Sequence, residues 1–115
     1  MIQQTELQLL REQIDTLDVQ LNDVLRQRRA CVAEVRAVKM QHGLPVSDRG
    51  REQAMLKQML EAEADEEFAL WKTSLFTLLF ALSRLDQWRG QDAEAAAQMT
   101  EKLRALLAEV DGLAR

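Results

Sequence analysis

The chain has 115 residues, a length that suits one domain with a modest hydrophobic core. Its 4 Gly, 1 Pro and lack of Tyr, against many Leu, Ala, Gln and Glu, favour an all-α fold. The net charge of −4 argues against a nucleic-acid surface. The apolar run at residues 75–82 is far shorter than the ~20 residues of a membrane span, and the first residues do not resemble a signal peptide. With one cysteine there is no disulfide framework, so we expect a cytoplasmic protein. From the charge and the short apolar run we expect that it binds neither nucleic acid nor a membrane.

Helix start and stop signals divide the chain into four predicted helices, at residues 6–41, 48–64, 65–89 and 92–113. The first ends at the stop signal His42-Gly43-Leu44-Pro45. Asp48 is the expected N-cap of the second helix, and Asp65 opens the third. The fourth carries apolar residues at heptad spacing: Ala96, Met99, Leu103, Leu106, Val110 and Leu113.

The first predicted helix is long for so small a protein. Its residues, at ~1.5 Å each, make a rod of roughly 54 Å, beyond the diameter of a globule of this size. An apolar seam follows it in steps of three and four: Leu7, Leu10, Ile14, Leu17, Leu21, Val24, Cys31, Val35 and Val38. The other helices are too short to cover this seam, so we expect an intertwined homodimer. A plain antiparallel coiled coil with no site is the alternative. Cys31 is expected to be a small core residue rather than a nucleophile.

Arg28 occupies a position in this seam where the heptad requires an apolar residue. A guanidinium taken out of water is costly unless an anion or hydrogen-bond acceptors meet it there. The seam contains no carboxylate, so a ligand anion is one candidate partner. A snorkelling arginine or an internal ion pair is the other interpretation, and periodicity alone leaves both open.

Other polar residues extend this pattern along the helices. Lys39 lies eleven residues after Arg28, close to three full turns, so both side chains point the same way about 16 Å apart. Arg11 lies about 25 Å from Arg28 on a different face, and only the Arg11 of an antiparallel second chain could come alongside. Ser83 and Gln87 interrupt an apolar stripe of the third predicted helix. Alone each would be a satisfied core residue, but together they suggest a cation-rich pocket for a compact anion.

In this order the residues resemble the AroQ-class chorismate mutases, the all-helical type II enzymes. The resemblance covers about residues 6–89. The matching runs are Leu10-Arg11-Glu12, Ile14-Asp15, Leu17-Asp18, Arg28-Arg29, Lys39, Pro45-Val46-Ser47-Asp48-Arg49-Gly50-Arg51-Glu52, Ser83 and Gln87. It implies a mutase domain at residues 1–90, with residues 91–115 as a C-terminal helical extension of the same domain. This extra helix is expected to pack on its own dimer, although docking onto another enzyme remains an alternative.

The resemblance implies an intertwined long-helix homodimer with two sites, each borrowing an arginine from the partner chain. The implied enzyme is an isomerase of the shikimate pathway and aromatic amino acid biosynthesis, which rearranges chorismate to prephenate. The reaction is pericyclic and requires no metal or cofactor. The protein has to hold a chair-like conformer of this dianionic substrate and stabilise the charge that separates in its transition state.

The resemblance also implies roles for individual residues. Arg28 and the second chain's Arg11 would bind the two carboxylates, with a hydroxyl donor from Ser83. Lys39 and the amide of Gln87 would donate to the ether oxygen as its bond breaks.

The remaining residues belong to the start of the second helix. Glu52 would accept a hydrogen bond from the ring hydroxyl, with backbone near Asp48, while Arg51 would order the helix start and add positive potential. Isochorismate carries its hydroxyl at a different ring position, so Glu52 favours chorismate as the substrate. An amino group in place of the ring hydroxyl could also bind Glu52. The alternatives are therefore an isochorismate-pyruvate lyase or an aminodeoxychorismate mutase on the same fold. A non-catalytic helical dimerisation module is the alternative of another class.

Overall fold

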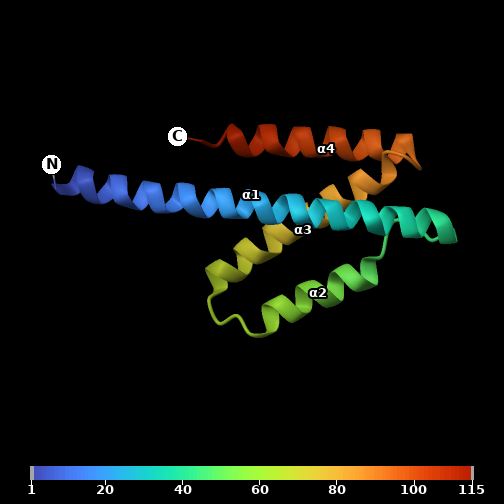
Figure 1. Cartoon of the computed structure of the whole chain (residues 1–115), viewed down its shortest axis with the longest axis horizontal. Coiled ribbons are helices and arrows are strands. Elements are labelled where there is room, and N and C mark those ends of the chain that lie inside the picture. The colour runs from blue at the N-terminus through green and yellow to red at the C-terminus, as the bar shows by residue number, and fades with distance from the viewer. Residues whose placement is uncertain (1, 115) are drawn as a thin grey trace.

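The computed structural model describes the backbone of residues 2–114 and the side chains of residues 5–114. Its described residues form four helices: α1 (Ile2–His42), α2 (Arg49–Glu61), α3 (Glu66–Trp88) and α4 (Ala93–Asp111). Figure 1 shows their arrangement. The predicted all-α class is confirmed, and α2, α3 and α4 begin and end within about three residues of the expected bounds. The first helix extends further toward the N-terminus than its apolar pattern predicted.

The helix ends form at the predicted signals. α1 ends at His42, and Gly43 follows with a φ of +63°, the left-handed conformation that glycine adopts without strain. Asp48 caps α2, accepting a 3.0 Å hydrogen bond from the backbone N–H of Arg51. Asp65 caps α3 in the same way. These caps fix where α2 and α3 begin, and with them the positions of the polar residues that follow.

The central element of the fold is α3, which contacts α1, α2 and α4. α1 is a rod that extends well past the other helices at its N-terminal end, and α4 runs in the opposite direction without contacting it in the described part of the chain (Figure 1). The molecule measures 61 × 32 × 25 Å, so the expected elongation is present. The buried apolar residues are few: Val46, Phe80, Ala81, Leu85 and Ala96.

α3 as a whole is apolar over a greater length than the run at residues 75–82 indicated. By length and composition alone, its 23 residues could cross a membrane. α3 contacts the three other helices, but only part of its apolar surface is covered: Leu85 is buried, whereas Leu70 and Trp71 are 66% and 72% exposed. Gln87, near its C-terminal end, is buried as well.

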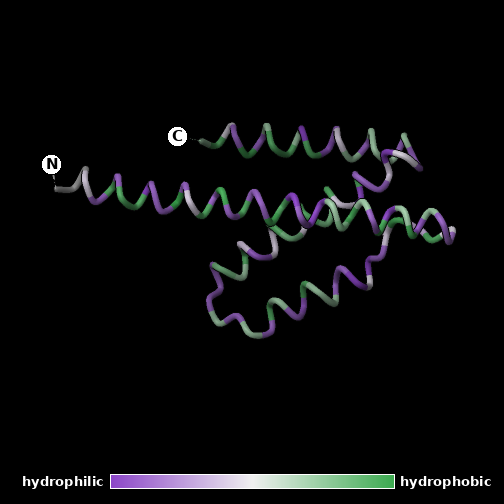
Figure 2. Tube along the Cα trace, viewed as in Figure 1, coloured by the Kyte–Doolittle hydropathy of each residue, from purple (hydrophilic) through white to green (hydrophobic). Residues whose placement is uncertain are grey.

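Much of the apolar seam of α1 is exposed in the single chain. Leu10, Leu17 and Val24 are 56%, 60% and 57% exposed, and the hydropathy trace of Figure 2 alternates between apolar and polar turns along the whole helix. Cys31 is exposed too, instead of lying in a core, because it borders an open cavity and is not packed against another side chain's full surface. An apolar stripe of this length is typical of a surface that another protein chain covers.

α4 packs on α3 only through its first half. Ala96 is buried and Met99 and Leu103 are half-buried, whereas Val110 and Leu113 are 59% and 73% exposed. The beginning of the predicted heptad stripe therefore packs on the bundle, and its end lies in solvent.

Candidate active site

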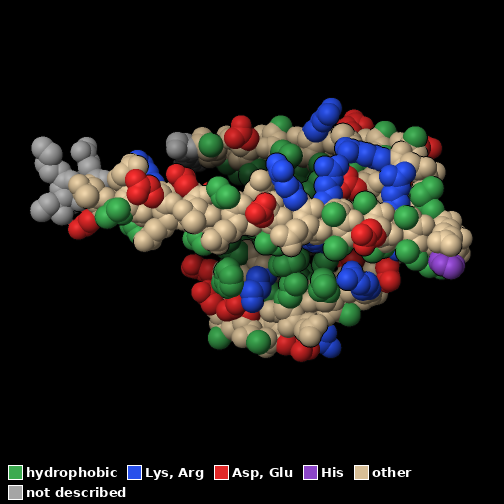
Figure 3. Space-filling model, viewed as in Figure 1, with side chains coloured by type: hydrophobic (Ala, Val, Ile, Leu, Met, Phe, Trp, Pro, Cys, Tyr) green, Lys and Arg blue, Asp and Glu red, His purple; other side chains and the backbone are tan. Residues whose placement is uncertain are grey.

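A cavity of about 430 Å³ lies among α1, α2, α3 and the loop that joins α1 to α2. This volume is within the usual range for a small-molecule site. Seven of the eight residues predicted to form a site line it: Arg28, Lys39, Asp48, Arg51, Glu52, Ser83 and Gln87. Its apolar wall consists of Cys31, Val32, Val35, Val46, Met55, Met59, Phe76 and Phe80. Figure 3 shows hydrophobic side chains gathered below α1, where α2 and α3 lie.

Arg28 is half-buried and reaches across from α1 to α3. Its Nη1 donates to Ser83 Oγ at 2.6 Å, and the same hydroxyl donates to the backbone carbonyl of Leu79 at 2.8 Å. Ser83 is therefore oriented by two bonds, and it holds the guanidinium at the cavity wall. A neutral hydroxyl does not balance the charge of Arg28, so the guanidinium retains donors for an anion. This arrangement differs from the internal ion pair that the sequence left open.

Lys39 lies at the other end of the α1 portion of the cavity. Its Nζ donates to the backbone carbonyl of Val46 at 2.7 Å, which ties α1 to the buried part of the following loop. An ammonium group has three donors, so this bond leaves two for a ligand.

Gln87 is only 6% exposed, and it lines the same cavity. Its Nε2 donates to the backbone carbonyl of Ser83 at 3.2 Å, which leaves its second N–H available. Among the described residues, its Oε1 has no hydrogen-bond partner. Oε1 is an acceptor, so an anion or an ether oxygen of a ligand would bind the free N–H of this amide and not its Oε1.

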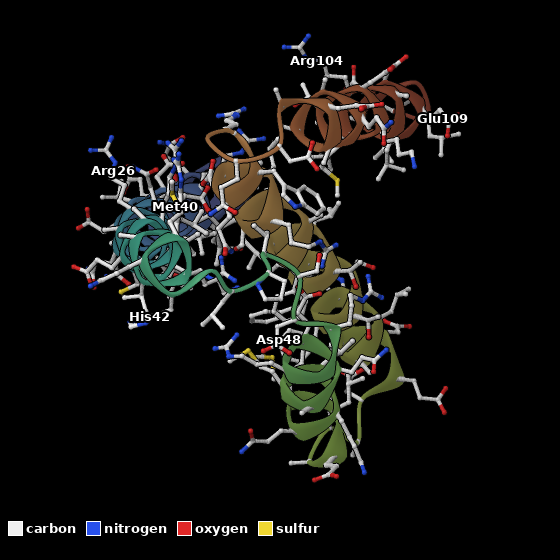
Figure 4. All side chains as sticks on the ribbon, turned by 90° about the vertical axis from the view of Figure 1, so that its right-hand side faces the viewer. Arg26, Met40, His42, Asp48, Arg104 and Glu109 are labelled. Atoms are coloured by element: carbon white, nitrogen blue, oxygen red, sulfur yellow. The ribbon has the colours of Figure 1, made fainter. Side chains whose placement is uncertain are left out.

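The start of α2 supplies the acidic side of the cavity. Asp48 uses its carboxylate to cap the helix, and in Figure 4, viewed from the C-terminal end of α1, it lies where α2 begins beside α3. Glu52, one turn later, forms an ion pair with Arg84 of α3. The side chains of this pair are 15% and 11% exposed, so both charges are largely removed from water.

Arg84 also lines the cavity, and the sequence analysis did not identify it. A signal was present, because Arg84 continues the stripe of Phe76 and Phe80 at a spacing of four residues.

The charges of the cavity favour an anionic ligand. Four cationic side chains line it, those of Arg28, Lys39, Arg51 and Arg84, against the two carboxylates of Asp48 and Glu52. The formal net charge of these six side chains is therefore +2, in a wall that is otherwise mostly apolar. A small molecule with two carboxylates would match it.

Arg11 is the one predicted site residue that does not line the cavity. It is exposed, toward the N-terminal end of α1, as its separation from Arg28 required. Outside the cavity, Arg29 of α1 pairs with Asp86 of α3 at 3.1 Å. Figure 3 shows Lys and Arg side chains gathered on the side of α1 that faces α4.

Comparison with known proteins identifies the family of the chain. A family model described as Chorismate mutase type II matches residues 10–109. The chain belongs to this family. The match includes most of α4, so it continues beyond residues 6–89, where the sequence resemblance was found.

Two curated relatives of this family member carry the name T-protein. One, from Enterobacter agglomerans, is 48% identical over 60 residues, which is 51% of this chain and 16% of the relative. The other, from Haemophilus influenzae, is 47% identical over 55 residues, which is 47% of this chain and 15% of the relative. The chain therefore corresponds to less than a fifth of each relative's length. No solved structure matches it significantly.

Proposed function

We propose that this protein is a chorismate mutase that converts chorismate to prephenate. The observation that carries the proposal is the cavity, which gathers Arg28, Lys39, Glu52, Ser83 and Gln87 from three helices around a net positive charge. Membership of the family supports the same reaction. The reaction is a unimolecular rearrangement in which a carbon–oxygen bond breaks as a carbon–carbon bond forms. The protein contributes a shaped pocket and positioned donors.

Binding of the substrate follows from the cationic wall. Arg28, oriented by Ser83, offers its remaining N–H groups to one carboxylate of chorismate, and the fork of an arginine suits that group. The apolar side chains opposite, including Phe80 and Val35, press the ring and side chain together. Holding the two reacting carbon atoms near each other removes much of the entropic part of the barrier.

The transition state develops negative charge on the ether oxygen as its bond to the ring breaks. Lys39 and Gln87 are the donors that we place at this oxygen, because each has an N–H left over after its bond to a backbone carbonyl. Their contribution is larger in the transition state than in bound chorismate, and this difference is what accelerates the reaction.

The start of α2 would recognise the ring hydroxyl. Glu52 accepts a hydrogen bond from this hydroxyl, with the backbone at Asp48 beside it. The capping bond from the Arg51 N–H to Asp48 holds this segment in place, and the Arg51 side chain adds positive potential at the cavity.

The complete site requires a second copy of the chain. The exposed apolar seam of α1, with Leu10 and Leu17 more than half exposed, supports a homodimer in which two long helices cover each other. If the two α1 helices run antiparallel, the second chain's Arg11 reaches the cavity and binds the remaining carboxylate. We place this dimer in the cytoplasm, consistent with a lone thiol at Cys31.

The test is the loss of chorismate absorbance with purified protein, with products separated by chromatography. We expect prephenate to form with ordinary saturation kinetics and without added metal or cofactor. Release of pyruvate from isochorismate, with no prephenate from chorismate, would replace the mutase by a lyase. No turnover of either compound would contradict enzymatic function and favour a dimerisation module.

A further inference from the structure

The ion pair between Glu52 and Arg84 lies in the part of the cavity assigned above to the ring hydroxyl of the substrate. It joins α2 to α3, and both side chains line the cavity. With 15% and 11% of their side chains exposed, the two charges are mostly desolvated. A desolvated pair costs free energy to bury and is weak evidence of stabilisation. The position of this pair in the cavity wall points instead to a role in the site.

The pair determines both where the Glu52 carboxylate lies and what charge a ligand meets. The Nη1 of Arg84 binds Oε1 of Glu52, which orients the carboxylate and leaves Oε2 as an acceptor. Because one positive and one negative charge lie side by side, their sum at this subsite is zero. A neutral hydroxyl that donates to Oε2 meets an acceptor of fixed geometry and needs no counter-charge.

A substrate with an amino group in place of the ring hydroxyl would meet the same two residues differently. At neutral pH an aliphatic amine is largely an ammonium ion, attracted by Glu52 and repelled by Arg84. Without the guanidinium, a lone carboxylate in this wall would favour the ammonium. With the guanidinium of Arg84 present, its repulsion offsets the attraction of Glu52 for the ammonium, and the ammonium still loses its hydration on binding.

We infer that Arg84 is a positioning and specificity-determining residue, which orients Glu52 and makes this subsite select a neutral hydroxyl over an ammonium group. The inference rests on the proposed function and deepens it. It also separates chorismate from its amino analogue, which the presence of Glu52 alone does not.

The experiment compares kcat/KM for chorismate with kcat/KM for the analogue that carries an amino group at the position of the ring hydroxyl. The variants change the net charge of the pair: Arg84→Gln makes it −1, Glu52→Gln makes it +1, and Arg84→Lys leaves it at zero. Arg84→Gln should lower the ratio in favour of chorismate by about tenfold or more, since juxtaposed like charges are costly. Glu52→Gln should raise the ratio. Arg84→Lys should keep it within about threefold while reducing both activities, because the compact ammonium on a flexible stem orients the Glu52 carboxylate less well than a planar guanidinium.

The matched control is Arg49→Gln. Arg49 is exposed and lines a groove beside Glu52 and Arg84, but it does not line the cavity, so the ratio should stay unchanged. Circular dichroism during heating checks that each variant is folded, and the opposite changes expected for Glu52→Gln and Arg84→Gln keep the test decisive if one is unstable.

A purely structural role for Arg84 would lower both activities in proportion and leave the ratio unchanged, which would overturn the inference. If the wild-type protein does not turn over chorismate at all, the proposed function fails and this inference fails with it. Wild-type turnover with a ratio insensitive to the charge of the pair overturns this inference alone.

Discussion

Replacing Arg28 by alanine is expected to lower kcat/KM for chorismate by about 30-fold to several thousand-fold. Loss of one partner from a desolvated, hydrogen-bonded charge pair costs about 2–5 kcal/mol, and each 1.4 kcal/mol corresponds to tenfold. Arg28 makes such a pair with a substrate carboxylate in our account, and its own support from Ser83 at 2.6 Å aims it into the cavity. Steady-state kinetics on prephenate formation measure the effect.

The control for Arg28 is Arg26→Ala. Arg26 lies on the same helix, is exposed, and points away from the bundle in Figure 4. Its removal takes away an equal charge and should leave kcat/KM nearly unchanged. Equal losses in both variants would mean that only the general positive potential of α1 matters, contrary to a specific contact at Arg28.

The second large effect is expected at Lys39. The variant Lys39→Ala should reduce kcat by about 10²-fold or more, with a smaller change in KM, as when one donor is removed from an oxyanion hole. The donor is needed chiefly when charge develops on the ether oxygen, so the loss falls on the chemical step. Single-turnover and steady-state measurements of kcat and KM check this division.

Lys39 also binds the carbonyl of Val46, so its loss is expected to affect stability as well. Thermal unfolding separates the two roles, because a structural effect lowers the unfolding midpoint and raises KM without a selective loss in kcat. Lys57→Ala, at an exposed position of α2 outside the cavity, serves as the matched control. Near-full activity in Lys39→Ala would remove this residue from the mechanism.

The fold was largely predictable because its boundaries are local. Gly43 at a positive φ and the capping aspartates Asp48 and Asp65 act within a few residues of themselves, so the chain alone indicates where helices stop and start. The apolar pattern did not predict where α1 begins, because the helix starts at Ile2, before the first apolar residue of the seam at Leu7. The exposure of Cys31 could not be read from periodicity, because a seam indicates a covered face without showing where a cavity borders it.

The sequence indicated which residues line the cavity, but not which of them contact each other. A period of eleven placed Arg28 and Lys39 on one face, and the polar interruptions at Ser83 and Gln87 marked the facing helix. The approach of α2 to α3 depends on tertiary packing, and the pairing of Glu52 with Arg84 across 32 positions follows from that packing alone. An isolated arginine on a helix gives no sign of which carboxylate it will meet.

The most direct test of a site built from two chains is complementation between Arg11→Ala and Arg28→Ala. Each variant alone should be nearly inactive, because every site in its homodimer lacks one arginine. The two variants, carrying different affinity tags, are refolded together and the mixed dimer is isolated by tandem purification. In that dimer one site combines the intact Arg28 of one chain with the intact Arg11 of the other. We expect chorismate to be converted to prephenate at about half the wild-type rate per dimer, since one of two equivalent sites is restored. A mixed dimer no more active than the two parent homodimers would contradict a shared active site.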